Sequence, residues 1–118
     1  MNKLLTLTDT ERQALETMVQ RLHTRYNDQV ESVTLFGSKA RGDSGPDSDI
    51  DVIVVLTNDD HRLRSNIRRL AARVSLEYDL LISMRAVGRS HWHELSHYRF
   101  PIYQAIQSEG ISLTPEPA

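Results

Sequence analysis

Apolar residues recur at helical spacing over the first part of the chain. Thr8 is followed three residues later by Glu11, the spacing of a capping box at the start of a helix. Apolar side chains then return every three or four positions as far as Asn27, at Leu15, Met18, Val19, Leu22 and Tyr26. This period predicts an amphipathic helix from about residue 8 to residue 27.

Two short apolar segments follow and are typical of β-strands. Residues 33–36 end at Gly37, and residues 50–56 are rich in the β-branched side chains that strands favour. The segment between them, residues 37–48, holds three of the five glycines and one of the four prolines. This composition predicts a loop, and loops between regular elements commonly carry binding and catalytic groups.

The second half of the chain alternates helical and extended patterns. Apolar spacing predicts a helix over residues 63–74, with arginines on its other faces that we interpret as solvent-exposed. Residues 80–87 predict a third strand, Ser90 is placed to cap the next helix, and a last helix is expected over residues 101–109. Residues 111–113 fit a short edge strand. This order predicts an α/β (α+β) fold, with a small mixed sheet of three to four strands flanked by helices.

Composition and charge narrow the class of protein. The chain has 118 residues, a formal net charge of -2 and no cysteine. This length predicts one domain over residues 1–118, and the small net charge gives no overall field that would attract nucleic acid or an anionic membrane. Without cysteine, a disulfide or a thiolate metal site is excluded. Because no run of about eighteen apolar residues is present, we expect a cytoplasmic protein.

Asp49 and Asp51 stand at the start of the second predicted strand. Side chains two residues apart on a strand point to the same face, with Cα atoms roughly 6.5 to 7 Å apart. Two carboxylates held this close repel each other unless a cation lies between them. Mg²⁺ suits this position because it binds carboxylate and phosphate oxygens, and a pair of such ions assists phosphoryl transfer. The sequence therefore predicts that Asp49 and Asp51 bind magnesium, with two ions expected.

The residues after the first predicted strand have the properties of a phosphate-binding loop. Gly37 allows a ligand to approach the backbone closely, and Ser38 offers a hydroxyl beside N–H groups at the start of a short helical turn. Lys39 and Arg41 add positive charge at the same place. We therefore expect these four residues to bind the phosphates of a nucleotide beside the two aspartates.

A third carboxylate is expected from Asp79, which directly precedes the third predicted strand. If that strand lies beside the second, Asp79 comes next to Asp49 and Asp51. Its predicted roles are to complete the ligand set of one metal ion and to accept the proton of an attacking hydroxyl. Glu77 is the alternative, and we prefer Asp79 because it adjoins the strand itself.

A separate motif, from His93 to His97, has the spacing of a zinc protease helix, with two histidines one turn apart and Glu94 between them. Such a site needs a third ligand, and only Glu109 and Glu116 follow as conventional oxygen ligands. We therefore favour a surface position over a zinc site. The histidines interpreted in this way are His23, His61, His91, His93 and His97.

Two segments together resemble a known family signature. They are residues 37–42, Gly-Ser-Lys-Ala-Arg-Gly, and residues 48–52, Ser-Asp-Ile-Asp-Val. Their combination resembles the signature of the DNA polymerase β-like nucleotidyltransferase superfamily, and the short chain is similar to its minimal nucleotidyltransferase (MNT) branch. The resemblance is specific over residues 36–56 and weaker at residues 79–81 and 106–113.

This resemblance implies a fold, a site and a partner. The fold would be that of the polymerase β-like nucleotidyltransferases. Gly37 and Ser38 would hold the triphosphate of ATP, Asp49 and Asp51 would bind the magnesium ions, and Asp79 would be the third carboxylate. Many MNT proteins are antitoxins paired with a helical HEPN toxin, and some silence the toxin by transferring AMP to one of its tyrosines.

Three kinds of function therefore stay open. The chain is an AMP transferase acting on a HEPN-type partner in a hetero-oligomer, a transferase onto a small molecule such as an aminoglycoside, or an antitoxin that neutralises by contact alone. We favour the first because the predicted helices leave little room for an enclosed pocket. Ile53 and Val55 share the strand face of Asp49 and Asp51, so we also expect the C-terminal helices or another subunit to cover that face.

Overall fold

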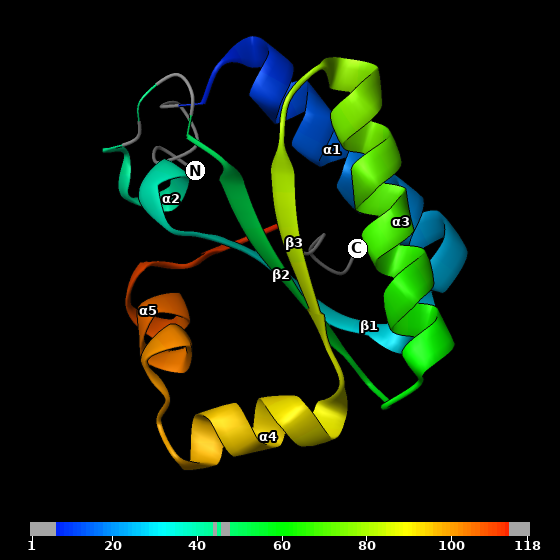
Figure 1. Ribbon diagram of the computed structural model, residues 1–118, viewed down its shortest axis with the longest axis vertical. Helices are drawn as coiled ribbons and strands as arrows, with labels where there is room; N and C mark the ends of the chain where they lie inside the picture. Colours follow the sequence, from blue (N-terminus) through cyan, green and yellow to red (C-terminus); the bar gives the residue numbers. More distant parts are fainter. Residues whose placement is uncertain (1–6, 44, 46–47, 114–118) are drawn as a thin grey trace, which may run out of the picture.

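The structure, a computed structural model, describes residues 7–43, 45 and 48–113. Figure 1 shows the course of the chain through these residues. In chain order the elements are α1 (Asp9–Tyr26), the 3-10 helix η2 (Asn27–Gln29), β1 (Val30–Phe36), α2 (Ser38–Arg41), β2 (Ile50–Leu56), α3 (His61–Tyr78), β3 (Ile82–Val87), α4 (Arg89–His97), α5 (Pro101–Glu109) and β4 (Ile111–Ser112). None of the described helices has both the length and the apolar character that a membrane span requires.

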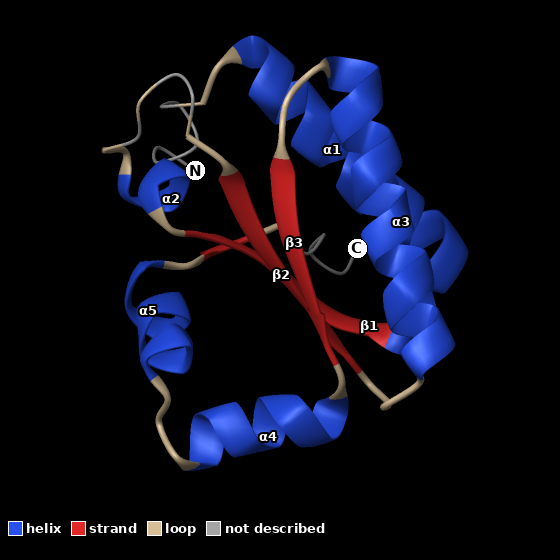
Figure 2. Cartoon of the chain, in the orientation of Figure 1, coloured by secondary structure: helices blue, strands red, loops and turns tan. Residues whose placement is uncertain are grey.

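The described strands form one mixed sheet in the order β3–β2–β1–β4. β1 pairs antiparallel with β2 and with β4, whereas β2 and β3 run parallel because α3 carries the chain back between them. Helices α1 and α3 lie on one side of this sheet, and α4 and α5 lie on the other (Figure 2). The predicted α/β fold with a small mixed sheet flanked by helices is therefore confirmed.

Strand β2 is buried on both faces after Asp51, as the apolar run over residues 52–56 requires. Val52 and Val54 belong to the core that α1 and α3 complete. Ile53 and Val55 belong to a second cluster with Ile106 of α5 and with residues of α4. The C-terminal helices therefore cover part of the face that carries Asp51, which was one of the two expected solutions.

The start of α1 follows the predicted capping box. The Thr8 hydroxyl accepts a hydrogen bond from the Glu11 N–H at 3.1 Å, and the Glu11 carboxylate accepts one from the Thr8 N–H at 2.8 Å. Two of the N–H groups that a helix start leaves unpaired are satisfied in this way. The cap fixes Glu11 in a position that also matters for the candidate site.

The turn between α3 and β3 is shorter than predicted, because α3 continues to Tyr78, beyond the predicted end at residue 74, although β3 begins at Ile82 and not at residue 80. The Leu80 N–H bonds to the Ser75 carbonyl, and Asp79 takes a left-handed conformation with φ 52°, so both residues end the helix. The Ser75 hydroxyl donates to the Ala71 carbonyl and accepts from the Ile82 N–H at 3.1 Å. This side chain joins the helix end to the first residue of the strand.

Candidate active site

The backbone that follows β1 lies directly against Asp51. Phe36 and Asp51 are partners in the antiparallel β1–β2 ladder, so the next residue, Gly37, reaches the Asp51 side chain. A Cβ atom added to Gly37 would lie 2.5 Å from Asp51 Oδ2, and the φ of Gly37 is 77°. Both facts require glycine here. The predicted phosphate loop and one predicted metal ligand are therefore neighbours.

Helix α2 begins immediately after this contact. The Gly37 carbonyl accepts hydrogen bonds from the N–H groups of Ala40 and Arg41, at 3.1 and 3.0 Å, which closes the first turn. No described residue accepts a hydrogen bond from the Ser38 N–H. An N–H group at the start of a helical turn is suited to a phosphate oxygen. Ser38 therefore has the geometry expected of a phosphate-binding residue.

The two aspartates repel each other in the folded protein. Asp51 is half-buried, and Asp49 is exposed beside it. Burial and the negative charge of Asp49 raise the pKa of Asp51, against the smaller opposite effect of Arg85 and Arg41. The positive charge of Arg85 and Arg41 is thus insufficient to offset burial and the repulsion between the two carboxylates. Oxygen ligands that lack a counter-charge fit Mg²⁺, which would supply it.

The structure corrects the role predicted for Lys39. Its side chain is buried, and Nζ lies 2.6 Å from Glu11 Oε2 and 3.4 Å from the Gly45 carbonyl oxygen. Burial acts to raise the pKa of Glu11, but the hydrogen bonds from Lys39 and Thr8 lower it overall. Lys39 therefore connects α2 to the start of α1 and does not present its charge to a nucleotide.

Arg41 is exposed at the same end of the sheet. Its Nε lies 3.0 Å from Asp43 Oδ2, and one terminal nitrogen lies 3.1 Å from Glu109 Oε2. The hydrogen bonds to Asp43 and then Glu109 raise the pKa of Arg41. Arg41 also acts electrostatically on Asp51. It is near the site but already paired, so its role as a phosphate ligand stays a prediction.

Asp79 does not take the predicted place beside the aspartate pair. It ends α3 in a left-handed conformation and does not continue into β3. Within the described residues, no three His, Cys, Asp or Glu side chains lie where they could hold a metal ion together. The alternative, Glu77, forms an ion pair with Arg21 at 2.9 Å. The expected convergence of three carboxylates is therefore corrected to a pair.

Two residues of β3 belong to the site and were missed. Ser83 is the register partner of Asp51, and Arg85 is the partner of Ile53, so both share the face of Asp51. Both side chains are exposed. The alternation of polar and apolar residues in β3 could have indicated them, because Ser83 and Arg85 are the polar positions. This alternation becomes informative only once β3 is known to lie next to β2.

The histidine motif lies on α4. The rings of His93 and His97 stack with their centroids 5.9 Å apart, and both side chains are exposed, as predicted. His23, His61 and His91 are exposed as well. None of these histidines belongs to a described group of three or more metal-binding side chains.

Comparison with known proteins identifies the family. The sequence profile of a family described as "Nucleotidyltransferase domain" matches residues 15–100. This chain belongs to the nucleotidyltransferase domain family. The matched segment of this nucleotidyltransferase domain contains the predicted phosphate loop that begins at Gly37 and both aspartates of the candidate site.

One relative and several solved structures are similar to this nucleotidyltransferase domain. A Methanocaldococcus jannaschii protein with the provisional name protein adenylyltransferase MJ0141 is 40% identical over 63 residues, which are 52% of this chain and 64% of that protein. The match thus spans less than two thirds of the relative. A toxin–antitoxin crystallised with AMP-PNP has a TM-score of 0.54 at 21% identity, and a mutant of the toxin–antitoxin MntA–HpeT has 0.57 at 18%. Each of these two matches covers 86% of this chain and 73% of the chain in the solved structure, and each shows a shared fold.

Proposed function

We propose that this nucleotidyltransferase domain transfers AMP from ATP to a hydroxyl group of a partner protein in a magnesium-dependent reaction. The observation that carries the proposal is the contact between Gly37 and Asp51. It brings a phosphate-binding backbone and a pair of uncompensated carboxylates together in a chain of this family. Neither feature alone would support a group-transfer site, since glycine turns and paired aspartates each occur for other reasons.

The residues of the site have distinct roles in this proposal. The N–H and hydroxyl of Ser38, with the exposed backbone of Gly37, hold the triphosphate. Asp49 and Asp51 would hold the two expected magnesium ions, which would supply positive charge to the phosphates. The acceptor oxygen bonds to the α-phosphorus, with loss of its hydroxyl proton, as the bond to the leaving pyrophosphate breaks. The exposed Arg85, on the same face as Asp51, is available to the charge of the phosphates.

A protein hydroxyl is the acceptor that the observations favour. The side chains next to Asp51 on β3, Ser83 and Arg85, are exposed, so the site is accessible from outside. A similar protein is named as a protein adenylyltransferase, and similar folds occur in toxin–antitoxin complexes. One of these complexes carries aspartate-to-glutamate substitutions two positions apart, and another carries a tyrosine-to-alanine substitution. These names support a toxin as the partner, and we propose that the acceptor is a tyrosine of a HEPN-type toxin in a cytoplasmic hetero-oligomer.

The proposal is tested by following the α-phosphate of ATP. The domain is purified together with the product of its neighbouring gene and incubated with ATP labelled at the α- or γ-phosphate, with magnesium or with EDTA. We expect label on a partner tyrosine from α-labelled ATP only, and only with magnesium. The Asp49→Asn, Asp51→Asn double variant should abolish it, whereas Asp28→Asn, a matched change of an exposed aspartate on η2, should not.

The other outcomes separate the alternative functions. Label on a small molecule added as a hydroxyl acceptor, such as an aminoglycoside, would indicate the small-molecule transferase. Neutralisation of the toxin by the double variant as well as by the wild type would indicate an antitoxin that acts by contact alone. Label from γ-labelled ATP, or equal label with the double variant, would contradict nucleotidyl transfer at this site.

A further inference from the structure

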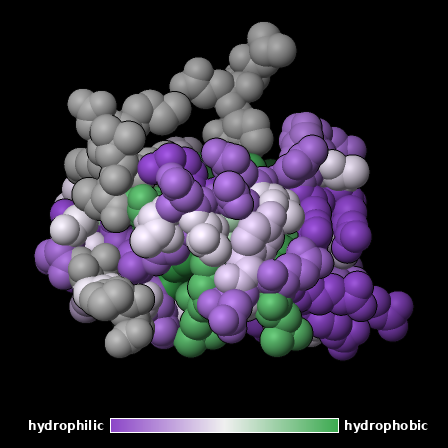
Figure 3. Space-filling model, turned by 90° about the horizontal axis from the view of Figure 1, so that it is seen from above, coloured by the Kyte–Doolittle hydropathy of each residue, from purple (hydrophilic) through white to green (hydrophobic). Residues whose placement is uncertain are grey.

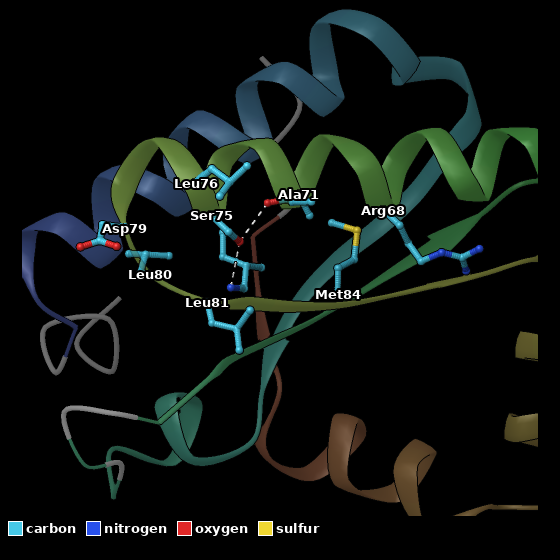
Figure 4. A pocket seen from close by; sticks show the side chains of 10 residues that line it. Arg68, Ala71, Ser75, Leu76, Asp79, Leu80, Leu81 and Met84 are labelled. Atoms are coloured by element: carbon cyan, nitrogen blue, oxygen red, sulfur yellow. Dashed lines mark hydrogen bonds between the residues drawn. The ribbon is translucent and has the colours of Figure 1, made fainter.

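A groove of about 750 Å³ runs between α3 and β3, on the opposite face of the sheet from Asp51. Leu76 and Ala71 line it from α3, and Leu81 and Met84 line it from the strand side (Figure 4). Leu76 is 83% exposed and Leu81 is 58% exposed, and both belong to the few large apolar side chains that the described residues expose. The view from above shows hydrophobic residues gathered on the side that faces the viewer in Figure 1, among hydrophilic ones (Figure 3).

The backbone beside this groove has unused hydrogen-bonding capacity. β3 is the edge strand of the described sheet, and its other neighbour is β2. The Ile50 N–H bonds to the Leu81 carbonyl, so in this parallel ladder Leu81, Ser83 and Arg85 bond to β2. The N–H and carbonyl groups of Met84, the middle residue of the outer row, therefore point away from the sheet. Another extended segment could pair with them.

The charge is positive at the Arg68 end of the groove, whereas Asp79 lines the other end (Figure 4). Helix α3 carries five arginines and one glutamate, Glu77, which is paired with Arg21. None of the five α3 arginines forms an ion pair with a described residue, although the chain as a whole has a net charge of -2. Arg68 lies at one end of the groove, and Arg64 lies one helical turn before it. The complementary ligand therefore carries negative charge at this end and apolar side chains along the rest.

We propose that this groove binds an extended, acidic segment of a partner protein, which pairs with the free edge of β3. Alternate apolar side chains of the segment would contact Leu76 and Met84, and acidic side chains would pair with Arg68. Because α3 and Met84 lie on the opposite face of the sheet from Asp51, the side chains of the segment that enter the groove point away from the candidate active site. The inference does not depend on the reaction proposed above.

A second copy of this chain fits the groove less well. Pairing of two β3 edges would place two α3 helices side by side, so that two sets of unpaired arginines would meet. A nucleic acid would match the arginines, but it offers no alternating apolar side chains for the exposed leucines. An acidic peptide segment matches the charge, the apolar lining and the free strand edge together.

The test uses a synthetic peptide of about eight residues that alternates valine and glutamate. Its matched controls are the valine–lysine peptide and a valine–glutamate peptide with a central proline. We expect the first peptide alone to bind, and the Met84 amide proton to gain protection from hydrogen exchange. Arg68→Glu should weaken binding by about tenfold. Arg62→Glu, the same change on the same helix but outside the groove, should alter it by less than about twofold.

Each remaining outcome contradicts the inference. One is the absence of binding at roughly 1 mM peptide, an affinity too weak to hold a partner. Another is equal binding of the lysine peptide, which would remove the charge argument. Protection of Met84 that depends on protein concentration alone would assign the edge to a second copy. If a single-stranded oligonucleotide binds more tightly than the valine–glutamate peptide, and Arg68→Glu abolishes that binding, the surface would be assigned to nucleic acid.

Discussion

Replacing Asp51 with asparagine should stabilise the metal-free protein while removing its function. Burial and the charge of Asp49 raise the pKa of Asp51 above its ordinary value of 3.8. The folded protein therefore binds the Asp51 proton more tightly than the unfolded chain does. As the pH rises from about 3.8 through the higher folded-state pKa, the metal-free protein loses this part of its stability. The Asp51→Asn variant has no carboxyl proton to lose, so it does not become charged and should escape this loss of stability at neutral pH.

The size of the effect follows from the separation of the two carboxylates. Residues two apart on a strand lie roughly 6.5 Å apart, where two unit charges repel by about 0.6 kcal/mol in water and about 2.5 kcal/mol at an effective dielectric constant of about 20. Because Asp49 is exposed, the real value lies toward the lower limit. We expect a gain of about 1 kcal/mol, which raises the Tm of a chain of this size by about 3 to 6 °C.

The assay is thermal unfolding in EDTA and again in saturating magnesium and ATP. In EDTA, Asp51→Asn should melt above the wild type, and the difference should shrink as the pH approaches 4. With magnesium and ATP the wild type should instead melt above Asp51→Asn. A ligand at a hundred times its Kd adds about 2.7 kcal/mol to the free energy of unfolding, and only the wild type is expected to bind it. Asp28→Asn serves as the control for removing one negative charge. A variant that melts below the wild type in EDTA, or that gains as much from the ligands, would refute the reasoning.

Three further changes probe the scaffold of the site. Gly37→Ala adds a Cβ 2.5 Å from a carboxylate oxygen at a φ of 77°, so it should abolish AMP transfer and cost about 1 to 3 kcal/mol in urea unfolding; unchanged transfer would contradict the close contact. Lys39→Met leaves Glu11 buried without its partner and should cost about 2 to 4 kcal/mol, most of which Glu11→Gln should restore if the pair is structural. Ser90→Ala removes the hydroxyl hydrogen bond, the larger of the two from Ser90 that lower the pKa of Asp59, and keeps the one from the Ser90 N–H, so it should reduce the Tm at neutral pH; a difference that persists below the folded-state pKa of Asp59 would argue against this pairing.

The elements that sequence periodicity predicted well are those with a long or purely apolar pattern. The helix from residue 8 to residue 27 and the strand over residues 50–56 were placed within a residue or two. The capping box at Thr8 was correct because its two hydrogen bonds join residues three apart, so local sequence determines them. The phosphate loop and Asp51 became neighbours as expected because both adjoin the same antiparallel ladder.

The errors concern side chains whose partners lie far away in the sequence. Lys39 has the local context of a phosphate ligand, but its partner Glu11 is 28 positions earlier, and only packing of α2 against α1 shows this. Asp79 was predicted to lie directly before a strand that begins at residue 80, whereas the helix continues to Tyr78 and Asp79 forms its left-handed end. Ser90 was expected to cap α4 but donates to Asp59, 31 residues away. Local pattern cannot reveal such contacts, because they depend on how elements pack.

The central claim is that Asp49 and Asp51 bind a magnesium–nucleotide complex beside Gly37. Isothermal titration calorimetry with a non-hydrolysable ATP analogue measures this directly. We expect binding by the wild type when magnesium is present, little in EDTA, and none by the Asp49→Asn, Asp51→Asn double variant. Equal affinity of the wild type and the double variant in magnesium would contradict the claim.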